Sequence, residues 1–511
     1  MLRQVKTENG WVKGIEAADP RITAFKGIPF AAPPVGKNRW RAPQPCENWE
    51  GVKEAYRFAP ISVQDTPGLG TDIYCREWHV DPDIAMDEDC LYLNVWTSAK
   101  KSDEKQPVLV WFFGGALQWG YPAEMEFDGE RLARRGVIVV TVNYRINVFG
   151  FLSHPQLTAE QPEAPTNFGH LDQQAGLKWV IRNIAAFGGD PKNITIAGQS
   201  AGGGSVLAQM ASPSSKDLFQ RAVIMSAMIR SPYGPAPVGI PEPLASAEQN
   251  GKNFFDFLGV TTLEEARALD AKHILHKYSE YAQSHPRMMN VMDNVFCTGD
   301  PLKLMMEGKC ANVPVMAGGT GDEFPSFLQA SSEEEFKEKI QKLFGEDADK
   351  FMQLPEALAN NGNGLYAKAN GIANTVKGVF GATKANGSVN NHYYYQFIPD
   401  IPGWDNPGTF HSVDLWFFFE TLAKCWRPFV GRHYDLARQM CNYWANFIKT
   451  GDPNGVDADG TPMPEWNPYT TETPACMNFT SEGAVPVEKE DNEYNKLLTK
   501  SILNIINNGW S

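Results

Sequence analysis

One serine in this chain stands in a sequence context that could make it a nucleophile. Ser200 is the centre of Gly198-Gln199-Ser200-Ala201-Gly202, a G-x-S-x-G pentapeptide. The apolar run 194–197 leads into it and the small-residue run 202–208 leads out of it, which predicts a strand, a sharp turn and a helix. Only small neighbours allow such a turn, and the N-terminus of the following helix favours negative charge. The pentapeptide therefore indicates acyl transfer through an exposed serine hydroxyl.

A serine hydroxyl needs a base to remove its proton, and the base needs an acid to fix its tautomer. In α/β-hydrolases the acid and then the histidine follow the serine, each on a loop after a strand. Asp322 and Glu323 both follow the strand-like run 313–317, and the residues alone leave the choice between them open. The histidines that come after these carboxylates are His392, His411 and His433. Position favours His411, because the other two stand at the expected starts of a strand and of a helix.

Backbone donors for a developing oxyanion are expected at the end of another strand. The apolar run 107–113 breaks into Gly114-Gly115-Ala116, where small residues would let backbone N–H groups point at a tetrahedral intermediate. The N–H of Ala201, directly after the serine, would add a further donor. A simple glycine turn is the alternative interpretation of Gly114-Gly115.

The elements that must position these residues alternate between strand-like and helix-like patterns. Continuous apolar runs cover 107–113, 137–142 and 222–225, and apolar residues recur at helical spacing within 171–187. This alternation predicts α/β units on a mostly parallel sheet.

The second half of the chain interrupts this alternation twice. Residues of about 240–300 and about 332–376 have helical patterns, and strand-like runs return after each. No repeat or low-complexity linker divides the chain. We therefore expect a single domain over 1–511, with the two helical insertions over the active site.

The composition excludes some classes of partner. The chain has 511 residues and a formal net charge of -14, which argues against nucleic acid and anionic membranes. No apolar run approaches the roughly 20 residues of a membrane span, and the N-terminus lacks the apolar core of a signal peptide, so a cytoplasmic location is expected.

The eight cysteines are widely spread and have no metal-ligand spacing. Free thiols in a reducing compartment are the expected state, and Cys75 and Cys90 are the one pair close enough in sequence for a loop disulfide. No metal and no organic cofactor is expected, because the chain has no H-E-x-x-H, P-loop or dinucleotide-binding pattern.

Three long blocks, in this order, resemble the type B carboxylesterase family, which includes the cholinesterases, and the chain looks like a bacterial-type member. The blocks are 25–36 (Phe-Lys-Gly-Ile-Pro-Phe and onward), 88–95 (Glu-Asp-Cys-Leu-Tyr-Leu-Asn-Val) and 187–202, which ends in the serine pentapeptide. The resemblance implies the α/β-hydrolase fold, with a large, mostly parallel central sheet flanked by helices.

The resemblance also implies roles for individual residues. It makes Glu323 the acid and His411 the base of a triad with Ser200. It assigns the oxyanion hole to the N–H groups of Gly115, Ala116 and Ala201. Ser226 and Asp414 fall where the family has a serine and a carboxylate that support the histidine.

The chain departs from the family pattern in ways that bear on the substrate. Gln199 stands where the family usually has Glu, so a negative charge beside the site is missing and a choline ester is less expected. Ala116 adds a methyl group to the oxyanion loop, which would restrict bulky tertiary alcohols. Val63 falls near the first cysteine of a disulfide in secreted members, so Cys90 would be unpaired.

Together these observations predict a serine carboxylesterase that forms an acyl-enzyme on Ser200 and acts on small-molecule esters. Short or medium acyl groups or aryl groups are expected, with phenolic acid esters as one candidate class. The regions expected near the pocket are rich in aromatic residues, which could line it: Phe112, Phe113, Trp119, Trp416, Phe417, Phe418 and Phe419. The alternative is that most of these residues belong to the core. Amide or thioester hydrolysis by the same triad is an alternative. A non-catalytic interaction protein on this fold is less expected, because such members typically lose the serine.

Overall fold

The structure is a computed structural model that describes residues 1–231, 233, 239–324, 326–357, 359–360, 365–369 and 371–509. Parts of the expected domain 1–511 and of the expected insertion 332–376 therefore lie outside the described residues.

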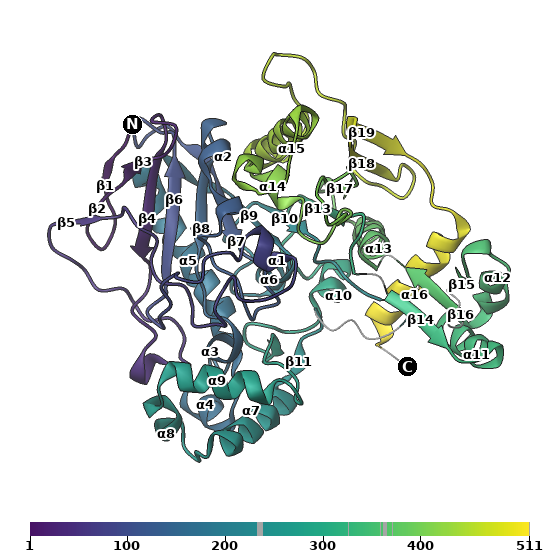
Figure 1. The fold of residues 1–511 in the computed structure, drawn as a ribbon, viewed down its shortest axis with the longest axis horizontal. Coiled ribbons are helices and arrows are strands. Elements are labelled where there is room, and N and C mark those ends of the chain that lie inside the picture. Colours follow the sequence, from purple (N-terminus) through teal and green to yellow (C-terminus); the bar gives the residue numbers. More distant parts are fainter. Residues whose placement is uncertain are drawn as a thin grey trace.

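One sheet of eleven strands forms the centre of the molecule, in the order β19-β18-β17-β13-β10-β9-β7-β8-β6-β4-β3 (Figure 1). The strands from β18 to β8 in this order pair in parallel, and the strands at both edges pair antiparallel. Their bounds are β3 (Ile15–Glu16), β4 (Thr23–Pro29), β6 (Tyr92–Thr97), β7 (Gln106–Phe112), β8 (Ile138–Val142), β9 (Gly189–Gln199), β10 (Arg221–Met225), β13 (Val315–Thr320), β17 (His392–Phe397), β18 (Ala475–Thr480) and β19 (Gly483–Glu488).

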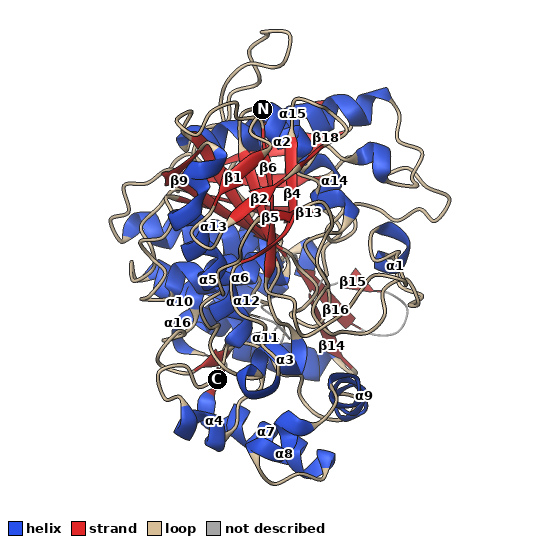
Figure 2. Cartoon of the chain, turned by 90° about the vertical axis from the view of Figure 1, so that its left-hand side faces the viewer, coloured by secondary structure: helices blue, strands red, loops and turns tan. Residues whose placement is uncertain are grey.

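Helices flank this sheet on both sides (Figure 2). The longer ones include α5 (Phe168–Asn183), α6 (Ala201–Ala211), α13 (Gly371–Ala385), α15 (Gly431–Thr450) and α16 (Glu493–Asn508), and the shorter ones include α2 (Glu130–Arg134), α3 (Asn147–Phe151), α4 (Pro155–Glu160), α10 (Pro301–Met306) and α14 (Leu415–Phe418). The prediction of a large sheet flanked by helices is confirmed. In the described part of the chain, no helix is long and apolar enough to cross a membrane.

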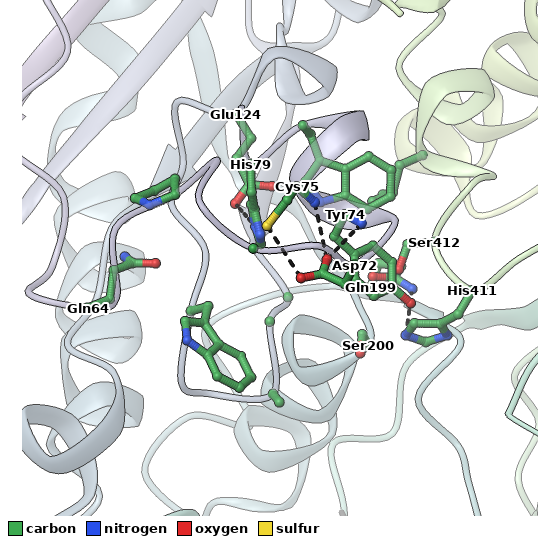
Figure 3. Close-up of a pocket in the computed structure, with 18 of the residues that line it drawn as sticks. Gln64, Asp72, Tyr74, Cys75, His79, Glu124, Gln199, Ser200, His411 and Ser412 are labelled. Atoms are coloured by element: carbon green, nitrogen blue, oxygen red, sulfur yellow. Dashed lines mark hydrogen bonds and ion pairs between the residues drawn. The ribbon is translucent and has the colours of Figure 1, made fainter. Parts of the chain in front are cut away.

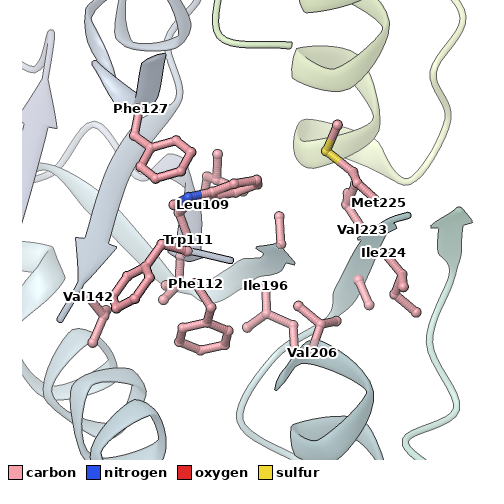
Figure 4. Packing of buried hydrophobic residues seen from close by; sticks show 14 of the residues in the cluster. Leu109, Trp111, Phe112, Phe127, Val142, Ile196, Val206, Val223, Ile224 and Met225 are labelled. Carbon is pink, nitrogen blue, oxygen red and sulfur yellow. The ribbon is translucent and has the colours of Figure 1, made fainter. Parts of the chain in front are cut away.

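The central strands are apolar along their whole length because both of their faces are covered. Trp111 and Phe112 are neighbours on β7 and therefore point to opposite faces. The ring centroid of Trp111 lies 5.5 Å from that of Phe418 of α14, whereas Phe112 points to the side of the sheet on which α6 lies (Figure 4). This packing on both faces fixes the ends of β7 and β9, from which the chain turns into the site.

The segment 240–300 is helical, with α7 (Leu244–Leu258), α8 (Leu263–Ala268) and α9 (Ala271–Tyr281) beside the short pair β11 (Glu242–Pro243) and β12 (Val291–Met292). Helix α8 begins with a capping box, in which Thr262 and Glu265 bond each other's backbone N–H. Figure 1 shows these helices together at one end of the molecule.

The segment 332–376 contains strand as well as helix. It includes α11 (Glu333–Phe344) and α12 (Ala348–Met352), and its strands β15 (Ala359–Asn360) and β16 (Leu365–Ala369) form a small antiparallel sheet with β14 (Ser326–Ala330). The helical pattern missed these strands, because each is short and β14 and β16 are far apart in sequence.

At the N-terminus a separate small sheet consists of β1 (Gln4–Lys6), β2 (Trp11–Lys13) and β5 (Val52–Glu54). The single-turn helix α1 (Tyr74–Glu77) follows it in a long connection that leads to β6.

Candidate active site

Ser200 occupies the sharp turn between β9 and α6. Its backbone angles are φ 55° and ψ -125°, outside the regions that residues other than glycine usually adopt. Its N–H donates a 2.9 Å hydrogen bond to the carbonyl of Met225 on the neighbouring strand, which holds the turn in place. The side chain consequently stands at the N-terminus of α6, where the helix dipole favours negative charge.

Two positions of the pentapeptide accept only glycine, because any side chain there would clash with neighbouring backbone atoms. A Cβ atom at Gly202 would lie 2.1 Å from the carbonyl oxygen of Phe112, and one at Gly198 would lie 2.3 Å from the backbone of Gly202. The end of β7 thus passes so close to the start of α6 that no side chain fits between them.

The structure brings Glu323 and His411 together on two loops that follow adjacent parallel strands, β13 and β17. His411 Nδ1 and Glu323 Oε2 are 2.5 Å apart, and Glu323 Oε1 accepts a 3.0 Å hydrogen bond from the N–H of Thr320. Both side chains are buried.

Asp322, the other carboxylate that the sequence left open, is exposed and has a different partner. It accepts hydrogen bonds from the N–H and the hydroxyl of Thr409, at 2.8 Å and 3.0 Å. These bonds tie the loop that carries Glu323 to the loop that carries His411.

The charges of the pair shift the pKa values of both groups. Burial alone would raise the pKa of the Glu323 carboxyl, but His411 and then Ser226 and Thr320 hold it below its ordinary value. Burial alone would lower the pKa of His411, but the charge of Glu323, with a smaller effect of Asp414, raises it. This arrangement stabilises the charged, imidazolium form of His411.

Gln199 forms a hydrogen bond with the other ring nitrogen of His411, Nε2. The Nε2 atoms of the two side chains are 3.3 Å apart, so the amide donates and the imidazole accepts. With Nδ1–H donated to Glu323, His411 is then in the tautomer whose Nε2 lone pair can take a proton. Among the described residues no hydrogen bond joins this nitrogen to Ser200; catalytic hydrogen bonds are often absent or long without substrate.

The loop after β7 has an unusual backbone conformation. Gly115 and Ala116 both have positive φ, at 111° and 55°. A Cβ atom at Gly115 would lie 2.2 Å from the carbonyl oxygen of Trp119, so glycine is required there. Among the described residues, the N–H groups of Gly115, Ala116 and Ala201 have no acceptor within the protein.

Ser226 and Asp414 lie behind the pair, and both are fully buried. A Cβ atom built on Gly319 would lie 3.0 Å from Glu323 Oε1 and 3.3 Å from Ser226 Oγ, and the Ser226 hydroxyl lowers the pKa of Glu323, so this hydroxyl faces the carboxylate. Asp414 accepts a 3.0 Å hydrogen bond from the hydroxyl of Tyr395. Burial, followed by the charge of Glu323, raises the pKa of Asp414 to about 7.

Ser200 and His411 open into a cavity of about 520 Å³ (Figure 3). Its described lining comes from 64–79, 114–127, 199–200, Phe324 and 411–415, with no residue of the helical insertions. The segment 240–300 instead supports the loop after β7 from outside the cavity, because Tyr278 donates a 2.8 Å hydrogen bond to Gln118.

The wall formed by 64–79, including α1, was not anticipated from the sequence. A buried ion network holds it: Arg427 contacts Glu77 at 2.6 Å and Asp405 at 3.0 Å. The segment has no apolar periodicity, so no sequence signal marked it.

The sequence left open whether seven aromatic residues line the pocket or mostly belong to the core. Of these residues only Trp119 is part of the cavity lining. The others are fully buried in the core around the central strands: Phe112, Phe113, Trp416, Phe417, Phe418 and Phe419. The aromatic lining residues are instead Tyr74, Trp78, Trp119, Phe127 and Phe324.

All eight cysteines lie in the described part of the chain and are free, so the structure has no bond between Cys75 and Cys90. Cys75 lines the cavity and Cys90 is buried. Among the described residues, no group of three or more His, Cys, Asp or Glu side chains could hold a metal ion.

A mixed sheet flanked by helices, with a strained serine between a strand and a helix, defines the α/β-hydrolase class. The Carboxylesterase family model matches residues 2–497. Para-nitrobenzyl esterase of Bacillus subtilis (strain 168) is 32% identical over 519 residues, covering 96% of this chain and 98% of that protein. Cholinesterase of Mus musculus is 30% identical over 505 residues, covering 90% of this chain and 81% of that protein.

A solved structure of PNB esterase has a TM-score of 0.77 at 28% identity, covering 98% of this chain and 99% of that one. The chain therefore belongs to the carboxylesterase family. It is a carboxylic ester hydrolase, as the sequence predicted.

Proposed function

We propose that this protein hydrolyses small carboxylic esters through an acyl-enzyme on Ser200. The observation that carries the proposal is the strained serine at the start of α6, which opens into the same cavity as a histidine that is 2.5 Å from a buried carboxylate. This is the combination of nucleophile, base and orienting acid that acyl transfer requires.

In the first step His411 Nε2 accepts the proton of Ser200 as Oγ attacks the ester carbonyl carbon. The N–H groups of Gly115, Ala116 and Ala201 stabilise the oxyanion. His411 then gives the proton to the leaving alkoxide, so an alcohol departs and the acyl group remains on the serine.

In the second step a water molecule loses a proton to His411 and attacks the acyl-enzyme. The tetrahedral intermediate collapses, His411 returns the proton to Ser200, and the carboxylic acid leaves. Glu323 keeps the imidazole in the productive tautomer and stabilises its charged form in both steps.

The walls of the cavity favour short or medium acyl groups or aryl groups. About 520 Å³ is enough for a small ester, and aromatic rings form much of the apolar lining. Gln199 leaves no charge next to the serine, so the proposed substrates are neutral around the scissile bond.

The test is hydrolysis of 4-nitrophenyl esters from acetate to decanoate by the parent and by Ser200→Ala. We expect turnover by the parent and a loss of at least about 10³-fold in kcat in the variant. Glu323→Gln should also lose most activity, whereas the matched change Asp322→Asn should keep it, because Asp322 contacts Thr409. Equal activity of the parent and Ser200→Ala would refute the assignment, and turnover of anilides or thioesters but not esters would favour the alternative chemistry.

A further inference from the structure

A second histidine–carboxylate pair lines the cavity, separate from the one beside Ser200. His79 Nε2 lies 3.1 Å from Glu124 Oε1. The side chain of His79 is 18% exposed and that of Glu124 is 3% exposed. In Figure 3 the pair lies at the top of the view, whereas Ser200 and His411 lie toward its lower right. The proposed hydrolysis uses neither residue of this second pair.

Glu124 is held so that the imidazole must donate to it. The same oxygen, Oε1, also accepts a 2.8 Å hydrogen bond from the N–H of Tyr121. Glu126 is fully buried close by; burial, followed by the charge of Glu124, raises its pKa well above the ordinary value, so Glu126 keeps its proton. Because Oε1 of Glu124 already accepts a hydrogen bond from a backbone N–H, it is also the acceptor toward the imidazole, and His79 Nε2–H donates to it.

The other ring nitrogen of His79 is consequently available to a ligand. Among the described residues, Nδ1 has no hydrogen-bond partner, and the ring is part of the cavity lining. Burial alone would lower the pKa of His79, but Glu124 and, at longer range, Asp72 raise it. The neutral ring presents a lone pair at Nδ1, and the charged ring presents an N–H.

A hydroxyl group suits both forms, because it can donate to the lone pair or accept from the N–H. An ammonium group would suit only the neutral ring. A carboxylate would suit only the charged ring, and Asp72 and Glu124, which also line the cavity, would repel it. Trp78 and Phe127 of the lining are aromatic and would pack against an aromatic ring that carries the hydroxyl.

We propose that His79, oriented by Glu124, binds a hydroxyl group on the part of the ester that lies away from the scissile bond. The substrate class is then esters with a hydroxylated aromatic ring on the acyl or the alcohol side. The inference rests on the proposed function and adds to it a residue that determines specificity.

The experiment compares two matched pairs of esters. Methyl cinnamate and methyl 4-hydroxycinnamate differ in the acyl part, and 2-phenylethyl acetate and 2-(4-hydroxyphenyl)ethyl acetate differ in the alcohol part. The ratio of kcat/KM within each pair is measured for the parent, for His79→Phe and for His79→Gln. The second variant can keep the contact with Glu124 without a ring nitrogen toward the cavity, and His276→Gln, at a side chain that is 71% exposed, is the control.

We expect the parent and the control to prefer the hydroxylated member of one pair by about 3- to 10-fold, which is the usual contribution of one hydrogen bond. Both His79 variants should lose this preference, because neither presents a ring nitrogen to the cavity. Turnover of the plain esters without any hydroxyl preference, or a preference that survives in either His79 variant, overturns the subsite alone. No turnover of any ester overturns the proposed function and the subsite with it.

Discussion

Replacing Gln199 with Glu tests whether the residue before the serine controls the titration of His411. The Gln199 amide nitrogen lies 3.3 Å from His411 Nε2, so a carboxylate of nearly the same size would face the imidazole at a similar distance. Two unit charges about 4 Å apart attract by about 4 kcal/mol at an effective dielectric constant of about 20. This energy corresponds to an upward pKa shift of about 3 units, which is an upper limit.

The burial of Gln199 reduces this limit, because the new carboxylate would itself lose solvation. We therefore expect the pKa of His411 to rise by about 1 to 2 units in Gln199→Glu. In the proposed mechanism His411 must be neutral to accept the serine proton, so activity would require a pH above the pKa of His411. The acidic limb of the kcat/KM profile should move to higher pH, with a loss of about 10-fold or more near pH 6 and little change near pH 9.

The assay is kcat/KM for 4-nitrophenyl butyrate between about pH 5 and about pH 9, with Gln199→Leu as an uncharged control. The control removes the amide hydrogen bond without adding a charge, so its acidic limb should move much less. An unmoved limb in Gln199→Glu, or equal shifts in both variants, would refute the electrostatic reasoning and with it the placement of Gln199 at the base.

Two further predictions concern the stability of the fold. The pKa of Asp414 is raised from 3.8 to about 7, so between these values the folded state binds more protons than the unfolded state, and stability falls as the pH rises. Asp414→Asn should therefore raise the free energy of unfolding by up to about 4 kcal/mol near pH 8 and change it little near pH 4, measured by urea unfolding; equal effects at both pH values would contradict this. Gly202→Ala should destabilise the protein by about 3 kcal/mol or more, because its Cβ would meet the carbonyl of Phe112, whereas Gly204→Ala in the same helix meets nothing within 4 Å and should stabilise it by up to about 1 kcal/mol. Equal melting temperatures of these two variants would show that the turn relaxes more easily than the structure implies.

The parts of the fold that could be predicted are those with a strong local signal. The strand β7 is apolar at successive positions because both of its faces are covered, and the glycines around Ser200 have no room for a side chain. Both features are visible in a few consecutive residues.

Other parts depend on contacts in space that residue types do not reveal. Residue type and position did not separate Asp322 from Glu323, which follow the same strand; the family resemblance favoured Glu323, and the structure distinguishes the two by their partners, Thr409 and His411. The cavity wall 64–79 has no periodic pattern of apolar residues in its sequence. It is held by the buried ion pair of Glu77 with Arg427 and not by the packing of an amphipathic face, so no local signal marked it. The position of the core aromatic residues stayed open, because side-chain type alone does not separate a pocket lining from the interior.

The proposed catalytic residues and much of the cavity lining come from different parts of the fold, and this bears on how such enzymes diversify. Ser200, Glu323 and His411 are placed by the ends of parallel strands, whereas much of the remaining cavity surface comes from the continuous segment 64–79. Substitutions in that segment can therefore change the cavity without moving the strand ends, provided that Glu77 is kept and its ion pair with Arg427 is preserved. A family built in this way can change what it admits by altering one short stretch of chain, and leave its hydrolytic chemistry untouched.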